Sequence, residues 1–509
     1  MAPKNRGKKG KQRTNKKASS EQREDKLSAL PDDILIGIIA RLPLPQAIAT
    51  GSLSRRWHRL WTNRNTTIQI TNRNYNCLLK FFTTFDDFMT YIITSPVIHS
   101  FSFEVFDVDN PWIWLPSFDS KLKQICERNV RELKVTFPIK YYGYGNHMID
   151  FPNVVFRTQS LVSVEFCSTH GWRLPESINL PNIKNLTLYF CPSNCDWLEK
   201  LTKACPSLEE VSLSYEDHDC FCRTYFKHNS FSIECSHRNL RRLFINFEKS
   251  ECLEFRINAP KIEYLSVRAP KSMIFTFEEE PIVLREANIE ITTLHYRTYN
   301  AITSKFYEKI SKVRVLSLHA FALDNFPTTL LRKATTLTLD MKRSNEAKMA
   351  LSSFLELCPL LDALTLKFLD FGKNNRKWIL PKPCHESGLP QSLKTVAFEA
   401  HWYTYFKPVK SLLNLIEYFL KRATCLEHFK VDARGCPNFE SRSVESKQNT
   451  EFMFCNLLFH CPMTSIGCEV EFVGRFFKMS RKAGPKVTRS DGQVIPFSRL
   501  PRHIFDPLE

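Results

Sequence analysis

Histidine and cysteine side chains gathered in one polar insertion are the residues of this chain whose types could bind a metal. They are His218, Cys220, Cys222, Cys235 and His237. A Cys-x-Cys pair followed by a Cys-x-His pair could supply four zinc ligands. The spacings are not those usual for zinc sites, however, and nothing else in the chain calls for a metal. We therefore favour a variable surface loop over a zinc site, and we predict no metal and no other cofactor.

Spacings typical of catalytic sites are missing from the sequence. It contains no Gly-x-Ser-x-Gly, no His-Glu-x-x-His and no Walker loop. A nucleophile among the 17 cysteines stays an alternative, but Cys205, Cys358 and Cys425 occupy apolar positions of a repeated pattern. A thiol at such a position serves as a small hydrophobic group. The sequence therefore favours a binding protein over an enzyme.

The first elements that stand out are three short helices predicted within residues 27–62. Pro31 suits the first position of a helix, where its missing N–H costs nothing. Asp32 and Asp33 then lie in the first turn, where the helix dipole favours negative charge. The apolar residues that follow are spaced as one broad helical face: Ile34, Leu35, Ile38, Ile39 and Leu42. This pattern predicts an amphipathic first helix.

Two further helices complete the segment. Pro43 and Pro45 end the first helix and can open a short second one, which Gly51 ends, and Ser54 is a suitable N-cap for the third. The third helix would place four large apolar residues on one face: Leu53, Trp57, Leu60 and Trp61. Domains below about 40 residues rarely build a stable core alone. The segment is therefore either the start of a larger domain or a module that binds a partner.

Three motifs stand in order in this segment: residues 30–35 (LPDDIL), Leu42-Pro43, and residues 53–61 (LSRRWHRLW). In residue type and spacing they resemble the F-box, in the plant type that continues into leucine-rich repeats. The resemblance implies a three-helix segment that docks on the Skp-type adaptor of a cullin-based ubiquitin ligase. The residues implied to form or support the docking surface, with Trp57 and the Leu30-Pro31 pair as anchors, are Leu30, Pro31, Ile34, Leu35, Ile38, Leu42, Pro43 and Trp57.

Beyond residue 95 a short apolar pattern recurs in the form Leu-x-x-Leu-x-Leu, with Val, Ile or Phe in place of some leucines. The alternation is typical of a strand with one face buried. The spacing between copies, roughly 21 to 33 residues, straddles and exceeds the usual leucine-rich-repeat period. The clearest copies are residues 130–135, 161–166, 183–188, 240–245, 262–267 and 313–318.

A longer unit, in which an amphipathic helix precedes a turn and a strand, occurs three times. Its turn and strand are residues 205–213, 358–366 and, in degraded form, 424–431. The apolar helix residues before them are Leu198 and Leu201; Met349, Phe354 and Leu355; and Leu415, Ile416, Phe419 and Leu420. Such a unit cannot bury its face alone, so the units must stack. We predict an α/β solenoid with parallel strands inside and helices and loops outside, over the alternative of an ordinary α/β domain.

This arrangement is similar to the leucine-rich repeats of plant F-box proteins. In addition, three motifs resemble the FBD segment that closes many such chains: residues 392–396 (SLKTV), 416–427 (IEYFLKRATCLE) and 468–472 (CEVEF). The FBD-like segment would cap the solenoid. A polar insertion at residues 435–450 is interpreted as a surface loop.

The resemblances and the composition divide the chain into five parts. We predict a disordered basic tail (1–26), an F-box (27–65), a leucine-rich-repeat solenoid (66–379), FBD-like repeats with a cap (380–473) and a basic C-terminal tail (474–509).

The net charge of +18 looks like the signature of a nucleic-acid-binding protein, but its distribution argues otherwise. Residues 1–26 carry a net +7 and residues 474–509 a net +5, which leaves +6 for the 447 residues between them. The N-terminal tail has no apolar anchor. It could be a nuclear-localisation signal, a polyanion contact or a solvated tail.

The compartment follows from what the sequence lacks. It shows no secretory signal and no apolar run near the ~20 residues that a membrane span needs. An odd number of cysteines then suggests reduced thiols. We expect a protein of the nucleus and/or cytoplasm with no membrane partner.

The resemblances imply a substrate receptor of a Skp–cullin–F-box ubiquitin ligase that is not itself an enzyme. Its F-box would dock the Skp-type adaptor, and through it a cullin, and its repeats would bind an unknown target protein. Nucleic acid is not an expected partner of such a receptor. The alternative is a basic nucleic-acid-associated or protein-interaction scaffold without a ligase role, whose tails would bind phosphates with a steep dependence on salt.

Overall fold

The computed structural model describes the chain between residues 27 and 496, with gaps. The described residues are 27, 29–42, 44–62, 67–73, 86, 89–90, 98–106, 115–137, 149–150, 152–191, 197–215, 231–247, 253–270, 273–281, 283–292, 304–319, 331–340, 351, 355, 357–368, 389–400, 406–434, 444–480, 486–489 and 494–496. The predicted basic N-terminal tail lies outside them.

Three short helices form the N-terminal module, as the caps and the apolar spacing predict. They are α1 (Asp32–Ala40), α2 (Leu44–Thr50) and α3 (Arg55–Thr62). Ser54 caps α3, because its Oγ accepts a hydrogen bond from the backbone N–H of Trp57 (3.3 Å). The helices enclose a small core made of Leu35, Ile39, Ala47, Trp57 and Leu60. The module therefore has its own core, although a very small one.

An ion pair that the sequence did not indicate fixes α3 against the start of α1. The Arg56 guanidinium donates to the Asp32 carboxylate (Nε to Oδ1, 2.8 Å) and to the carbonyl oxygen of Leu30 (2.6 Å). The predicted apolar face of α3 is wrong at one position. Leu53 precedes the helix in a turn and is 64% exposed, so it cannot pack with Trp57.

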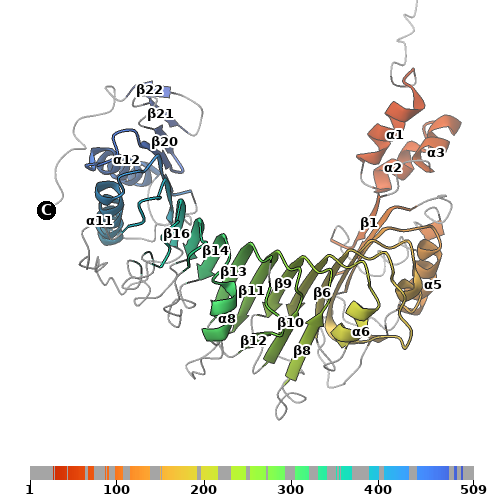
Figure 1. The fold of residues 1–509 in the computed structure, drawn as a ribbon. Coiled ribbons are helices and arrows are strands. Elements are labelled where there is room, and N and C mark those ends of the chain that lie inside the picture. Colours follow the sequence, from red (N-terminus) through yellow and green to blue (C-terminus); the bar gives the residue numbers. More distant parts are fainter. Residues whose placement is uncertain are drawn as a thin grey trace, which may run out of the picture.

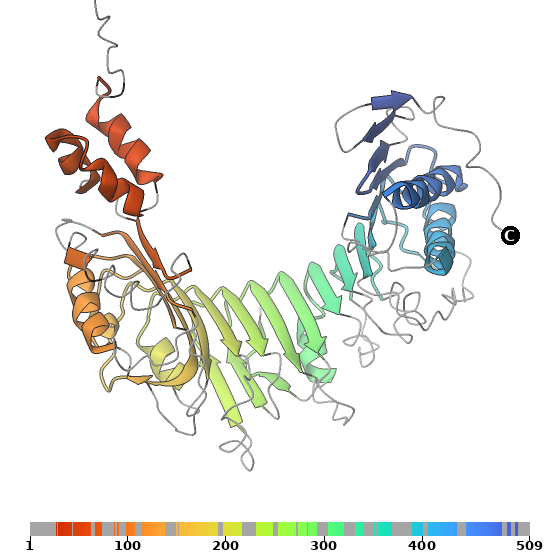
Figure 2. The same ribbon diagram turned by 180° about the vertical axis from the view of Figure 1, so that it is seen from behind.

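One curved parallel sheet follows this module and makes an open arc (Figures 1 and 2). Its strands follow one another in chain order as direct neighbours. The first seven are β1 (Thr67–Thr71), β2 (Ser100–Glu104), β3 (Glu132–Phe137), β5 (Ser163–Arg173), β6 (Asn185–Cys191), β7 (Glu210–Tyr215) and β9 (Arg242–Phe247). The short β4 (Ile149–Asp150) pairs with the end of β5.

The second half of the sheet continues in the same parallel order. It consists of β11 (Tyr264–Pro270), β13 (Glu286–Thr292), β14 (Val315–His319), β15 (Thr336–Asp340), β16 (Ala363–Phe368), β17 (Thr395–Ala400), β18 (His428–Asp432) and β19 (Glu469–Val473). We name the sheet from β1 to β19 the main sheet.

The register of the main sheet explains why the apolar pattern recurs. Strand side chains alternate between two faces, so each copy sends its apolar residues to one side. Pairing then aligns them in rows: Leu133, Val164 and Leu186 are successive partners. All six copies named from the sequence bury their three apolar positions, the first just before the strand and the other two on it, at β3, β5, β6, β9, β11 and β14. The prediction of a parallel solenoid is confirmed.

Helices cover the outer, convex side of the main sheet toward both ends of the arc and at one place near its middle (Figure 1). They are α5 (Leu115–Cys126), α6 (Trp197–Lys203), α8 (Ser304–Ile310), α11 (Phe406–Arg422) and α12 (Val444–His460). The predicted inward faces of α6 and α11 are confirmed, since Leu198, Leu201, Leu415, Ile416, Phe419 and Leu420 are all buried. Met349 and Phe354 lie outside the described residues.

The middle of the convex side holds strands that the sequence did not predict. A second parallel sheet is formed by β8 (Phe231–Ser236), β10 (Leu253–Asn258) and β12 (Ile274–Phe277). A series of tilted ring contacts joins it to the main sheet and to α8: Phe247, Phe255, Phe275 and Phe306 follow one another at centroid distances of 6.1, 6.1 and 5.6 Å.

The C-terminal end corrects two expectations. The predicted surface loop at 435–450 is wrong over its second part, because α12 begins at Val444 and buries Phe452, Cys455 and Leu458. Residues beyond 473 are not only a tail. The antiparallel strands β20 (Phe477–Ser480), β21 (Lys486–Arg489) and β22 (Val494–Pro496) extend the sheet past β19.

A partly buried carboxyl group ties this end together. The Glu451 carboxylate on α12 accepts hydrogen bonds from the backbone N–H groups of Arg475, Phe476 and Phe477 (3.1, 2.9 and 2.8 Å), in the turn between β19 and β20. Gly474 permits this close approach, since a Cβ there would collide with the Glu451 carboxylate and the Phe472 ring. Burial raises the pKa of Glu451, although the three N–H groups act in the opposite direction.

This carboxyl group should make the stability of the C-terminal end depend on pH. Because its pKa is raised in the folded chain, the fold retains a proton that the unfolded chain releases, so stability falls as pH rises from about 4.5 through the raised pKa. Glu451→Gln cannot ionise and should lose that dependence. Thermal unfolding of both proteins across this range checks the prediction. A difference between them that does not change with pH would contradict it.

Candidate functional site

The predicted docking residues of the three-helix module divide into an exposed and a buried set. Ile34 and Ile38 are 52% and 39% exposed, and Pro31 is also exposed. Leu30 and Leu42 are half-buried and pack against the module's core. Leu35 and Trp57 lie inside that core and are almost completely buried. Pro43 lies outside the described residues.

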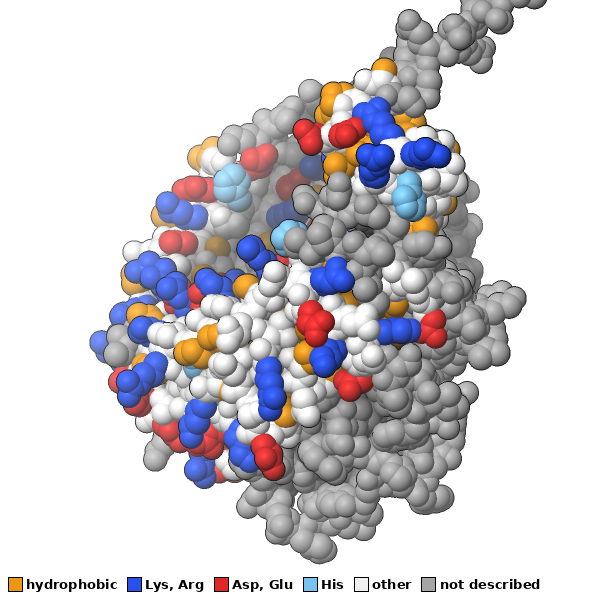
Figure 3. Space-filling model, turned by 90° about the vertical axis from the view of Figure 1, so that its right-hand side faces the viewer, with side chains coloured by type: hydrophobic (Ala, Val, Ile, Leu, Met, Phe, Trp, Pro, Cys, Tyr) orange, Lys and Arg blue, Asp and Glu red, His pale blue; other side chains and the backbone are white. Residues whose placement is uncertain are grey.

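The apolar face of α1 therefore has two stripes. Leu35 and Ile39, four residues apart, face the module's own core, while Ile34 and Ile38, also four apart, face solvent. Figure 3 shows hydrophobic side chains at the surface of this module, beside basic ones. An exposed isoleucine pair on so small a module is the kind of surface that marks a protein interface.

Trp57 has a different role from the anchor that the sequence predicts. An interface anchor must reach the partner, but Trp57 is only 5% exposed and packs within the module. It holds α3 against α1, behind the predicted docking residues of α1. The sequence missed the parallel contribution of Arg56, whose bonds to Asp32 and Leu30 hold the same two helices. Its position inside the arginine-rich motif gives no signal that it bonds inward.

The second candidate surface is the concave face of the main sheet, opposite the helices (Figure 2). Polar residues between the buried positions line it, and many form ion pairs across neighbouring strands. The Lys134 ammonium group lies between the carboxylates of Glu104 and Glu165 (3.0 and 3.2 Å). Further pairs are Arg242–Glu210, Arg268–Glu290, Lys367–Glu399 and Lys430–Glu471. Exposed pairs of this kind contribute little stability, so a ligand can exchange them for its own.

The centre of this face has a different character. The rings of Phe244 on β9 and Tyr264 on β11 lie 5.0 Å apart and are half-buried. Beyond them, strands β14 to β17 carry two rows of uncharged side chains, each row made of residues that are paired across neighbouring strands. One row is Val315, Thr336, Ala363 and Thr395, and the other is Ser317, Thr338, Thr365 and Ala397. Small neutral side chains at these positions, which begin two strands beyond the half-buried rings, allow a bound protein segment to approach the sheet closely.

Three described cysteines, Cys205, Cys235 and Cys358, are buried packing residues. Burial raises the pKa of the Cys205, Cys235 and Cys358 thiols to about 12. These groups are therefore protonated at neutral pH and poor nucleophiles. Cys425, which the repeat pattern placed in the core, is instead exposed.

Two residues of the candidate zinc cluster can be placed. Cys235 lies in the core on β8, and a ring nitrogen of His237 is 3.0 Å from the carbonyl oxygen of Cys205. His218, Cys220 and Cys222 lie outside the described residues. Among those described, no group of three potential ligands is arranged to hold a metal ion.

In the described part of the chain, no helix has the length and apolar character that crossing a bilayer requires.

Comparison with known proteins connects both surfaces to one family. The family model described as At1g61320/AtMIF1, LRR domain, matches residues 97–460, and that of the F-box domain matches residues 27–69. F-box/FBD/LRR-repeat protein At5g22660 of Arabidopsis thaliana is 25% identical over 489 residues, covering 90% of this chain and 99% of the relative. F-box/LRR-repeat protein 13 of the same plant is 25% identical over 443 residues, covering 81% and 90%.

Proposed function

The chain belongs to the plant F-box/leucine-rich-repeat family, and from this premise we propose that it is the substrate-recognition subunit of a Skp–cullin–F-box ubiquitin ligase. Its F-box docks the Skp-type adaptor, and its solenoid binds the target protein. The observation that carries the proposal is the exposed pair Ile34 and Ile38 on α1. These two residues belong to the F-box but do not pack into its core.

The adaptor would complete a core that the F-box begins. Covering Ile34 and Ile38 removes apolar area from water, and the half-buried Leu30 and Leu42 lie beside the same small core. Each fully covered aliphatic side chain stabilises such an interface by about 1.5–3 kcal/mol. Arg56 and Trp57 contribute indirectly, since they hold α3 in place behind this surface.

The solenoid would act by proximity and not by chemistry. A target bound on the concave face is held at a fixed distance from the ubiquitin-loaded enzyme, so a bimolecular encounter becomes effectively intramolecular. F-box/LRR proteins are typically non-catalytic adaptors. The raised thiol pKa values of the buried cysteines support the same role here.

Reconstitution of the complex tests this function. The full-length chain, a Skp-type adaptor and a cullin are mixed and separated by size, with and without the adaptor. We expect the chain to co-elute with the cullin only when the adaptor is present. Direct cullin binding without the adaptor, or no ternary complex from a well-folded chain, would contradict the proposal.

We also propose that the protein works in the nucleus and/or cytoplasm, with residues 1–26 as the import signal. Ten Lys or Arg against three acidic residues in this segment support it. Fused to a fluorescent protein too large to diffuse through nuclear pores, residues 1–26 should shift most of the fluorescence into the nucleus. A matched fusion with its ten basic residues changed to Gln should stay outside. Equal distribution of the two fusions would contradict this prediction.

A further inference from the structure

The residue immediately before each strand of the main sheet forms a row along one edge, which we name the start row. The same pair of backbone hydrogen bonds recurs from one member of the row to the next. The carbonyl oxygen of His99 accepts hydrogen bonds from Arg131 and Glu132, and that of Arg131 accepts them from Val162 and Ser163. Between β2 and β18 the members are His99, Arg131, Val162, Lys184, Glu209, Arg241, Glu263, Arg285, Arg314, Thr335, Asp362, Lys394 and Glu427.

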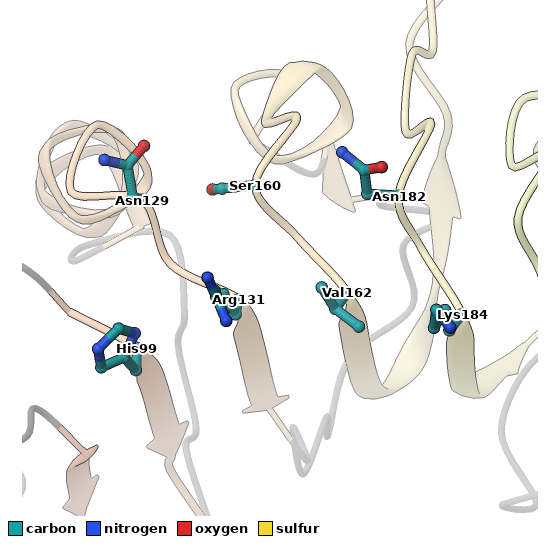
Figure 4. A pocket seen from close by; sticks show the side chains of 7 residues that line it. All are labelled: His99, Asn129, Arg131, Ser160, Val162, Asn182 and Lys184. Atoms are coloured by element: carbon teal, nitrogen blue, oxygen red, sulfur yellow. The ribbon is translucent and has the colours of Figure 1, made fainter.

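Val162 interrupts this row of polar and charged side chains, and a pocket of about 560 Å³ lies there. It is the one apolar member among the described residues of the row, and its short side chain leaves room between Arg131 and Lys184. Figure 4 shows His99, Arg131, Val162 and Lys184 side by side at the strand starts, with Asn129, Ser160 and Asn182 on the turns above them.

The pocket is suited to an anion. Two cations and a histidine line it together with two amides and a hydroxyl, and no carboxylate is among the lining residues. Arg131 makes no ion pair with any described residue. Lys184 is held at one side by Glu209 just outside the pocket (2.9 Å). The exposed Lys184–Glu209 pair is weak enough for an anionic ligand to replace.

The spacing of the cations favours a phosphate group over a carboxylate. Arg131 and Lys184 immediately precede β3 and β6, which are separated only by β5, so their backbones lie roughly 10 Å apart. A phosphate has three acceptor oxygens and about two negative charges, so it can bond to both cations at once. Arginine can also bind it in a bidentate manner, through two parallel N–H···O bonds.

We propose that this pocket binds the phosphate of a phosphorylated serine or threonine in the target protein. That the phosphate belongs to the target rests on the proposed function, whereas the phosphate site itself does not. The start row lies on the same edge as the F-box, because α3 ends at Thr62 and β1 begins at Thr67. A phosphorylated segment here would be held at the ligase end of the solenoid.

The variants that test this site change its charge in opposite directions. Arg131→Gln and Lys184→Gln each remove a charged contact and should weaken phosphate binding about ten-fold or more. Glu209→Gln releases Lys184 and should strengthen binding several-fold. Arg314→Gln, on the same row but five strands beyond Lys184, is the matched control and should change nothing. Arg131, Lys184 and Arg314 are exposed and Glu209 is half-buried with its side chain at the surface, so the variants should fold.

The measurement is fluorescence polarisation of full-length protein with a degenerate peptide library that has one fixed phosphoserine, beside the same library with serine. Line broadening in the phosphorus NMR spectrum of inorganic phosphate is measured in parallel.

Phosphate-dependent peptide binding that follows the expected order of variants supports the proposal. Binding of inorganic phosphate alone would overturn its assignment to the target, and no binding, or equal binding by Arg131→Gln and Arg314→Gln, would overturn the site. Adaptor binding should be normal in every variant, so a failure here is distinct from a failure of the ligase role.

Discussion

The double variant Ile34→Asp, Ile38→Asp should lose binding to the Skp-type adaptor by a factor of about 100 or more. Both side chains are exposed on α1 and make no part of the module's core, so the change should leave the fold intact. In the complex they would place two carboxylates in an apolar interface, where an unpaired charge is very costly. Single interface residues of this kind contribute about 2 kcal/mol each. Isothermal titration of the full-length chain with the adaptor measures the loss.

A matched control uses two exposed apolar residues at the other end of the arc. Leu457 on α12 and Ile466 in the turn before β19 are 45% and 97% exposed. Leu457→Asp with Ile466→Asp adds the same two charges and should bind the adaptor like the wild type. If this control and the α1 variant lose binding equally, general charge repulsion would explain the loss and the docking surface would be wrong.

Trp57→Ala should remove adaptor binding in a different way, by unfolding the F-box. Removing a large aromatic residue from a core usually costs about 3–5 kcal/mol. Among the described residues, the module's core holds Leu35, Ile39, Ala47 and Leu60 besides Trp57, so it has little stability to lose. Hydrogen exchange of the full-length chain should show α1 to α3 unprotected while the strands of the main sheet stay protected.

Trp57→Phe is the companion to this experiment. It keeps an aromatic ring in the core and should restore most of the protection in α1 to α3 together with most of the affinity. The contrary result would be a Trp57→Ala protein that keeps full protection in these helices but no longer binds the adaptor. Trp57 would then be an interface residue, which would contradict the core role that its 5% exposure indicates.

Strand positions could be predicted well because each strand carries its own signal. Alternation in copies such as residues 240–245 and 262–267 requires no knowledge of the partner strand, and parallel stacking of like units then fixes the register. The strands of the second parallel sheet, β8, β10 and β12, could not be predicted because their sequences do not carry the repeated apolar pattern. β10, for example, reads LEFRIN, and its role depends on Phe247 and Phe275 packing against Phe255.

The start of α12 was missed for a related reason. Residues 444–450 are polar and look like a loop, yet they form the first turns of a helix whose later residues, from Phe452 onward, are buried. Tertiary packing further along the helix outweighs the local composition. The exposed side of such an element gives no signal in one sequence.

The exposed apolar surface that we propose for docking could be predicted as a segment but not residue by residue. The apolar spacing of α1 identifies Ile34, Leu35, Ile38 and Ile39 together. A helix that packs against its own module on one side and carries an apolar surface on another has a single broad apolar face in its sequence. Only the packing of Leu35 and Ile39 with Trp57 separates the core from the surface. The start-row pocket could not be predicted at all, since it depends on bringing residues 99, 131, 162 and 184 to one edge.

The most direct test of the ligase-receptor role is the mass of the species formed by the full-length chain and a Skp-type adaptor, measured by light scattering after size-exclusion chromatography. We expect a 1:1 complex for the wild type and two separate species for the Ile34→Asp, Ile38→Asp variant. A well-folded wild-type chain that elutes apart from the adaptor would contradict the account.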